Sequence, residues 1–208
     1  MKAYKAVIYD IDGTLLNTFD MNMYPLLRII QEELGERWTL EQVRRFYAQP
    51  GLKTMKDLGI RDIEKTYARW VAYVNAYEKG AEPYCGMENV LQVFHAAGIR
   101  QAIVSSKMKA QYKIDVEGHG LDRYMETAVL EEDTLKHKPD PEPILECLRR
   151  MHLTPSDAVY IGDSPSDLKA AHAAGVDFGL AYWGNPNAEG FEKAEYLFHS
   201  PEEMLRLL

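Results

Sequence analysis

The sequence is poor in cysteine, in long hydrophobic runs and in net positive charge, and each shortage excludes a class of protein. Only two cysteines occur among 208 residues, Cys85 and Cys147, and their spacing fits neither a disulfide framework nor a zinc site, so we expect a reducing, cytoplasmic setting. Apolar residues never run together for the ~20 positions of a membrane-spanning helix, and the chain opens without a signal-peptide pattern. The formal net charge of −8 argues against nucleic acid or an anionic membrane surface as a partner, because both attract basic proteins.

Short apolar stretches alternate with amphipathic stretches through most of the chain. The apolar stretches are rich in Val, Ile and Ala and do not alternate strictly with polar residues, which is typical of parallel strands that helices cover on both faces. We predict strands at residues 5–9, 101–104, 127–130, 158–161 and 177–180. The pattern therefore predicts an α/β fold built on a doubly wound parallel sheet.

Helical periodicity replaces this alternation after the first predicted strand. Thr39 followed by Gln42 predicts a capping box, and a longer helix is expected over residues 62–79, with Gly80 as the residue that ends it. The insert leaves and rejoins the core through short linkers, so we expect it to act as a cap. The expected domains are an α/β core of residues 1–17 and 84–208 and a helical cap of residues 18–83.

Charged and hydroxyl side chains follow the predicted strands at their carboxyl ends, where open parallel sheets bind ligands. The set consists of Asp10, Asp12, Gly13 and Thr14 after the first strand, Ser105, Ser106 and Lys107 after the second, Lys138 before the next helix, and Asp163 and Asp167 after the fourth. Carboxylates held close together repel one another, and their burial is costly unless a cation and hydrogen-bond donors compensate. Magnesium fits best, because it accepts one or two carboxylates, keeps several waters and bridges to a phosphate oxygen.

These residues fall into four motifs that resemble those of the haloacid dehalogenase superfamily with an inserted helical cap of the C1 type. The matching segments are Asp10-x-Asp12-Gly13-Thr14, Ser105, Lys138 and Gly162-Asp163-x-x-x-Asp167, in the order and spacing of the family. Together they cover the core almost from end to end. Among the members, those similar to phosphoglycolate phosphatase have the closer pattern, which includes Trp183-Gly184 after the fifth strand.

The resemblance implies a magnesium-dependent phosphatase that hydrolyses small phosphate monoesters through an aspartyl-phosphate, with phosphoglycolate as the first candidate substrate. Asp10 would attack phosphorus, while Asp12 would protonate the leaving oxygen and then activate water. Ser105 and Lys138 would hold the phosphoryl oxygens. The expected magnesium ligands are the carboxylates of Asp10 and Asp163 and the backbone carbonyl of Asp12, with Asp167 orienting a bound water or Lys138.

Further substrate contacts are expected at Gly13 and Thr14, whose amides could donate to phosphate, at Ser106, and at Lys53 in the cap. Lys107 has two readings, since it could also reach a phosphate or could be a surface residue where a helix begins. The partner would be a small phosphate compound, while the oligomeric state stays open.

Two alternative functions also have to be weighed against these motifs. A β-phosphoglucomutase-like enzyme has the same motifs but returns the phosphoryl group to a sugar. A phosphate sensor or receiver-like module could also cluster acids at strand ends, yet it has no use for a general acid at Asp12 or for a lid. Turnover of p-nitrophenyl phosphate separates the enzymes from the signalling module.

Overall fold

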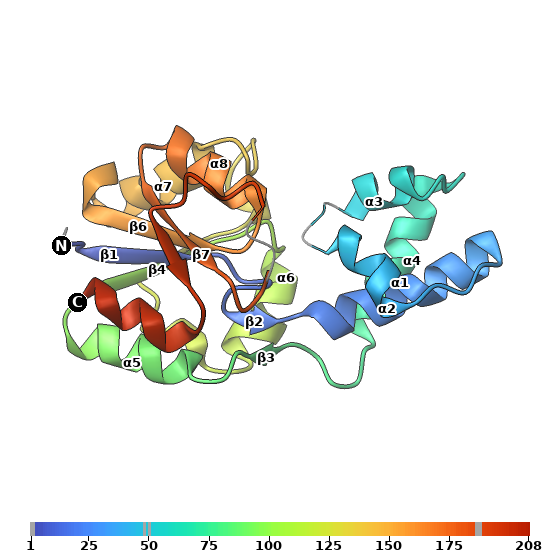
Figure 1. Ribbon diagram of the computed structural model, residues 1–208, viewed down its shortest axis with the longest axis horizontal. Helices are drawn as coiled ribbons and strands as arrows, with labels where there is room; N and C mark the ends of the chain where they lie inside the picture. Colours follow the sequence, from blue (N-terminus) through green and yellow to red (C-terminus); the bar gives the residue numbers. More distant parts are fainter. Residues whose placement is uncertain (1–2, 48, 50, 186–188) are drawn as a thin grey trace. The chain divides into compact units, whose positions relative to one another are not determined.

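The computed structural model describes residues 3–47, 49, 51–185 and 189–208, which belong to two compact units (Figure 1). The first unit comprises Met1–Asn17 and Pro83–Leu208, and the second comprises Thr18–Glu82. The two linkers pair with each other, since β2 (Leu16–Asn17) and β3 (Glu82–Pro83) form a two-stranded sheet. Within the described residues, no helix is both long and apolar enough to cross a membrane.

The first unit is built on a six-stranded parallel sheet of order β5-β4-β1-β6-β7-β8. Its strands are β1 (Ala6–Tyr9), β4 (Arg100–Val104), β5 (Thr127–Val129), β6 (Ala158–Gly162), β7 (Asp177–Ala181) and β8 (Tyr196–Phe198). The predicted α/β fold and its doubly wound sheet are confirmed, and the five predicted strands agree with the observed ones to within one residue at each end. The prediction missed β8, an edge strand of three residues whose short apolar run resembles many loop segments.

Helices cover both faces of this sheet (Figure 1). On one face lie α7 (Glu142–Met151) and α8 (Pro165–Ala173), and on the other lie α5 (Met87–Ala96) and a final 3₁₀ segment, Pro201–Leu207. Strand residues such as Ile8 and Tyr160 pack with Ile144 and Leu148 of α7 in one buried cluster. Because both faces are covered, β1 and β6 are buried at every position, which explains why their sequences lack polar alternation.

The long secondary-structure elements of the second unit are helices. It contains α1 (Phe19–Leu34), α2 (Leu40–Val43), α3 (Gly51–Asp57) and α4 (Ile63–Asn75). The predicted capping box is present, because Thr39 accepts a hydrogen bond from the Gln42 amide and Gln42 accepts one from the Thr39 amide. Trp70 of α4 is buried, and its indole donates to the carbonyl oxygen of Asn22 in α1 at 3.1 Å.

The predicted end of the last helix was wrong by four residues. The helix does begin after the N-cap Asp62, but it ends at Asn75 instead of continuing to residue 79. The Ala76 amide still bonds back to Ala72, whereas Gly80 belongs to a separate turn in which its amide donates to the carbonyl of Tyr77. Gly80 therefore does adopt a left-handed conformation, with φ of 62°, but it closes a turn and does not cap the helix.

Candidate active site

The ends of β1, β4 and β6 lie next to one another in the sheet, so the residues that follow them meet at one edge. Tyr9 of β1 pairs with Ile103 of β4 on one side and with Ile161 of β6 on the other. The Asp10 amide donates to the Ile161 carbonyl at 2.9 Å, which continues the ladder by one residue and fixes the backbone of Asp10. Sheet register therefore brings together motifs that are about 150 residues apart in the sequence.

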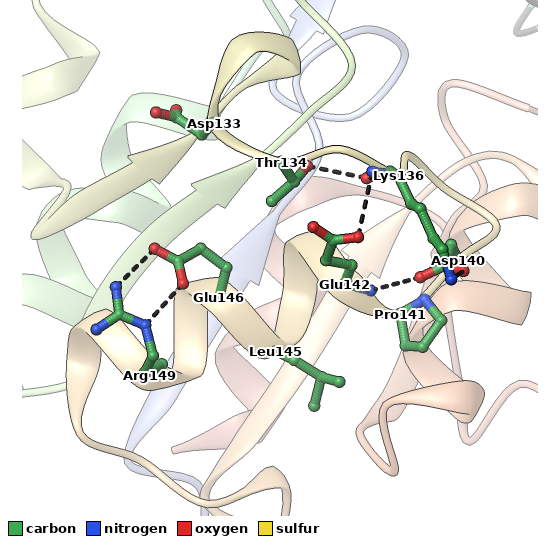
Figure 2. A pocket seen from close by; sticks show the side chains of 9 residues that line it. All are labelled: Asp133, Thr134, Lys136, Asp140, Pro141, Glu142, Leu145, Glu146 and Arg149. Atoms are coloured by element: carbon green, nitrogen blue, oxygen red, sulfur yellow. Dashed lines mark hydrogen bonds and ion pairs between the residues drawn. The ribbon is translucent and has the colours of Figure 1, made fainter.

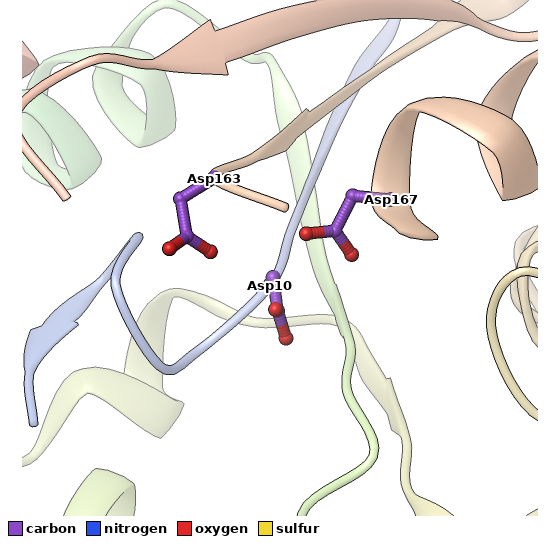
Figure 3. A group of neighbouring side chains, drawn as sticks. All are labelled: Asp10, Asp163 and Asp167. Carbon is purple, nitrogen blue, oxygen red and sulfur yellow. The ribbon is translucent and has the colours of Figure 1, made fainter. Parts of the chain in front are cut away.

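Three buried carboxylates form the centre of this edge, and we call Asp10, Asp163 and Asp167 the acid cluster. One oxygen of each lies within 4.8 Å of the others. Figure 3 shows Asp163 and Asp167 extending from the end of β6 and from α8 toward the space beside Asp10. The sequence predicted Asp10 and Asp163 as carboxylate ligands of a magnesium ion and Asp167 as a residue that supports them, and the structure places all three together.

Lys138 supplies the positive charge within this group. Its ammonium lies 3.1 Å from Asp10 Oδ2 and 2.6 Å from Asp167 Oδ1, and it donates to the Tyr160 hydroxyl at 3.0 Å. Tyr160 in turn donates to the carbonyl oxygen of Val104 at 2.8 Å. Three carboxylates and one ammonium leave two negative charges if all are ionised, which is the charge that a divalent cation neutralises.

The prediction did not include Tyr160. A buried tyrosine needs a partner for its hydroxyl, so a tyrosine within the otherwise apolar strand of residues 158–161 was the available signal. In the structure this hydroxyl accepts from Lys138 and so holds the ammonium between Asp10 and Asp167.

The two acids of the fourth motif differ in how their oxygens are used. Asp167 Oδ1 accepts from Lys138, and Asp167 Oδ2 accepts from the amide and the hydroxyl of Ser164 at 3.0 and 2.6 Å. By contrast, both oxygens of Asp163 are buried and have no hydrogen-bond partner among the described residues. Buried carboxylate oxygens are almost always satisfied, so Asp163 fits a cation ligand and Asp167 fits a supporting residue.

The pKa values of these residues indicate the same shortage of positive charge. Burial raises the pKa of Asp10 to about 6, with Lys138 opposing the shift and Asp167 and Asp12 adding to it. Burial, reinforced by Asp167 and Asp10, raises the pKa of Asp163 well above its usual range. Burial alone would lower the pKa of Lys138, but the two carboxylates outweigh that effect and raise it. The carboxylates therefore lack compensating positive charge, which a divalent cation would supply.

Gly13 makes room for one of these carboxylates. A Cβ at Gly13 would lie 2.2 Å from Asp163 Oδ2, and the backbone there has φ of +75°, so a larger residue would both clash and strain the loop. The neighbouring Thr14 is fully buried, and its hydroxyl has no hydrogen-bond partner among the described residues.

Side chains in the segment after β7 donate hydrogen bonds to backbone carbonyls in the loops that carry the first and fourth motifs. The Trp183 indole donates to the carbonyl oxygen of Thr14 at 3.0 Å, and the Asn185 side chain donates to the carbonyl oxygen of Asp163 at 2.9 Å. Between them, a Cβ at Gly184 would lie only 1.7 Å from the carbonyl oxygen of Gly13. The sequence marks Trp183-Gly184 only as part of a family pattern, and no local pattern indicates Asn185.

Lys107 is not a surface residue, so that reading of the sequence was wrong. Its side chain is buried, and its ammonium lies 3.2 Å from Asp12 Oδ1 and 2.5 Å from Asp115 Oδ2. Burial alone would lower the pKa of Lys107, but Asp12 and Asp115 together raise it. Nothing in the sequence pattern marked Asp115, because it lies in a π-helical turn, Lys113–Glu117, where the usual helical spacing does not apply.

The remaining predicted residues differ in their placement. Ser105 follows β4 and is buried at the edge of the sheet, where its hydroxyl accepts from the Lys107 amide at 3.4 Å, whereas Ser106 is exposed. Lys53 belongs to the second unit, where its ammonium lies 2.5 Å from Asp57 and donates to Gln49 at 3.3 Å. The structure therefore brings together the predicted site residues of the first unit, whereas Lys53 forms an ion pair with Asp57 within the second unit.

A separate hollow of about 460 Å³ lies beside the start of α7, and it shares none of the candidate site residues (Figure 2). Its charged groups already have partners. Glu142 accepts the amides of Leu135 and Lys136, and Glu146 forms an ion pair with Arg149. The acid cluster is the stronger candidate for the active site, because buried charge lacks compensation there.

Comparison with known proteins identifies the family of the chain. The model of the family "Haloacid dehalogenase-like hydrolase" matches residues 7–181. A phosphoglycolate phosphatase of Thiobacillus denitrificans is 33% identical over 82% of this chain and 80% of its own. A protein of Caldanaerobacter subterraneus named "Putative pyrophosphatase PpaX" is 29% identical over 98% of this chain and 94% of its own.

Among solved structures, a protein of Lactobacillus plantarum described as a "putative phosphoglycolate phosphatase" superposes with a TM-score of 0.90 at 29% identity. The superposition covers 99% of this chain and all of that one. The chain belongs to the haloacid dehalogenase-like hydrolase family.

Proposed function

We propose that this protein is a magnesium-dependent phosphatase that hydrolyses small phosphate monoesters through an aspartyl-phosphate at Asp10. The observation that carries the proposal is the buried acid cluster, in which both oxygens of Asp163 lack a partner among the described residues while Asp10 is held beside Lys138. Such a site suits an anion only when a cation is also bound. The phosphatase names of the relatives support the same reaction class.

Asp10 is positioned for nucleophilic attack. Its Oδ1 accepts the Ile11 amide at 2.7 Å and its Oδ2 contacts Lys138, so the carboxylate has a fixed direction. An Asp10 oxygen would form a bond to phosphorus as the bond to the leaving oxygen breaks, and water would later release inorganic phosphate and restore the carboxylate. Asp12 is about two-fifths exposed at its side chain, so it is accessible to a leaving group and to water.

The other core residues would bind and orient. Lys138 and the Ser105 hydroxyl would contact the phosphoryl oxygens, and the exposed Ser106 lies on the same loop. The carboxylates of Asp10 and Asp163 and the backbone carbonyl of Asp12 would hold Mg²⁺, with Asp167 supporting Lys138. When bound, the cation supplies positive charge that offsets the repulsion between the carboxylates and a phosphate dianion.

Two substrates deserve priority because relatives carry their names. Phosphoglycolate and pyrophosphate are both small, and each has a second anionic group beside the phosphoryl group that is transferred. We favour phosphoglycolate, whose leaving group is an alkoxide and so makes full use of Asp12 as a proton donor. Pyrophosphate has a better leaving group, and its hydrolysis would depend on Asp12 less.

The test is a panel of small phosphates assayed with Mg²⁺ for released inorganic phosphate. It contains phosphoglycolate, pyrophosphate, p-nitrophenyl phosphate and β-glucose 1-phosphate, and the last is also followed for conversion to glucose 6-phosphate. Rapid release from phosphoglycolate with slower release from the others supports the proposal. Efficient isomerisation with little release would assign a mutase instead, and no turnover of any member would refute the enzyme assignment.

A further inference from the structure

A buried ion pair of Lys107 and Asp115 lies beside the acid cluster, and the proposed reaction gives neither residue a role. Lys107 contacts Asp12 at 3.2 Å and Asp115 at 2.5 Å. The side chains of Lys107 and Asp115 are only 6 and 7% exposed, whereas that of Asp12 is 39% exposed. The group is therefore a buried ion pair with one accessible carboxylate at its end.

Stability alone does not explain this pair. Removing an ammonium and a carboxylate from water is costly, and two apolar side chains of similar size often serve the core as well or better. The informative feature is the third member, because Asp12 is the residue proposed to exchange protons with the substrate. A fixed cation at that distance restricts where the Asp12 carboxylate can lie.

The backbone of Lys107 is held in place by two hydrogen bonds. Its backbone carbonyl accepts the Glu131 amide at 3.1 Å, and its own amide donates to the Ser105 hydroxyl at 3.4 Å. Asp115 comes from the π-helical turn Lys113–Glu117, in which the neighbouring Val116 is fully buried. The ammonium is thus held from its own loop and from a packed helical turn, and Asp12 is the accessible end of the group.

We propose that Lys107 is a positioning residue whose ammonium, anchored by Asp115, holds the Asp12 carboxylate in the place from which it serves the leaving group and the attacking water. The inference rests on the proposed function, since it requires Asp12 to act as the acid and base. It adds two residues that do not touch the substrate but act through one that does.

The experiment is a double-mutant cycle between Lys107→Met and Asp12→Ala, with kcat and KM measured on an alkyl phosphate and on p-nitrophenyl phosphate. Met keeps most of the length of Lys but removes the charge. Because the single variant leaves Asp115 buried without its ion-pair partner, the same cycle is also run in an Asp115→Asn background, where that charge is absent. Lys109→Met is the matched control, since Lys109 lies two residues further along, at the start of α6 (Lys109–Tyr112), pairs with Asp133 and is half exposed.

With Asp12 present, Lys107→Met should lower kcat for the alkyl phosphate at least about tenfold, while KM changes little. The loss should not exceed that of removing the acid-base residue itself, which is ~10²–10⁴-fold. With Asp12→Ala already present, the same change should cost nothing further, because Lys107 acts through Asp12. Lys109→Met should leave both constants unchanged.

Three results would overturn the inference. In the first, Lys107→Met has no effect on kcat. In the second, its effect is the same with and without Asp12. In the third, activity returns when Asp115→Asn restores thermal stability, which would mean that the pair serves only the fold. If Asp12→Ala itself keeps its rate, the proposed function fails first, so the two failures are distinguishable.

Discussion

Replacing Asp10 by Asn should stabilise the metal-free protein while it abolishes turnover. Burial raises the pKa of Asp10 from 3.8 to about 6. A pKa difference of about two units corresponds to about 3 kcal/mol in the free energy of unfolding. The folded state is destabilised by that amount once this carboxylate is ionised. Asn has nearly the same shape and never ionises, so Asp10→Asn should recover at most about 3 kcal/mol at pH 8.

The pH dependence has a definite sign. Because the folded protein binds this proton more tightly than the unfolded chain, stability falls as pH rises from about 4 to 6, and the full loss persists above that range. The advantage of Asp10→Asn should therefore be absent at pH 4 and complete at pH 8. Under the proposed function Mg²⁺ binds only the folded wild-type protein, so adding it should shrink the advantage or reverse it.

Urea unfolding with EDTA, repeated at pH 4, 6 and 8 and again with Mg²⁺, measures this effect. Asp157→Asn is a control of opposite sign, because Thr154 and Lys5 lower the pKa of Asp157 and its replacement should destabilise the protein at pH 8. A metal-free Asp10→Asn protein that is no more stable than wild type at pH 8 would refute the electrostatic account of the site. Turnover by a well-folded Asp10→Asn protein would refute the covalent mechanism.

Three further predictions concern the same site. Asp12→Ala should lower the rate by ~10²–10⁴-fold, and more for alkyl than for p-nitrophenyl phosphates, whereas equal losses would exclude Asp12 as the proton donor. EDTA should silence the enzyme and Mg²⁺ should restore it, while Ca²⁺, with its larger and looser coordination shell, should support it poorly; full activity in metal-free buffer would contradict the cation assignment. Gly184→Ala should lower both thermal stability and kcat, because its Cβ would lie 1.7 Å from the Gly13 carbonyl oxygen, and wild-type values for both would show that the loop shifts freely.

The fold was readable from the sequence because most of its strands are buried on both faces. Continuous apolar runs bounded by polar loops locate β1 and β6 to within a residue. The edge strand β8 has only three residues, and the end of α4 depends on which turn forms after Asn75, so neither feature has a distinctive local pattern.

The acids and the lysine of the site were readable for a different reason. Sheet topology brings the ends of neighbouring parallel strands together, so position in the sequence was enough to group Asp10 with Asp163. The residues that support them could not be grouped this way. Asp115 reaches Lys107 from a π-helical turn, and Asn185 reaches the carbonyl of Asp163 from a loop, and neither contact follows from strand order.

The spacing of the fourth motif can itself be explained by helix capping. Ser164 is the N-cap of α8, and Asp167 is the third residue of the helix, so each side chain satisfies the other's backbone amide in a capping box. That arrangement uses one oxygen of Asp167 and leaves the other for Lys138. Asp163 precedes the N-cap, so no helix amide is directed at it and both of its oxygens remain for a cation. The four-residue separation of Asp163 and Asp167 therefore leaves the oxygens of one acid without a protein partner and gives the other acid to the lysine. If Asp163 holds the proposed cation, the Mg²⁺-induced rise in melting temperature should fall further with Asp163→Asn than with Asp167→Asn.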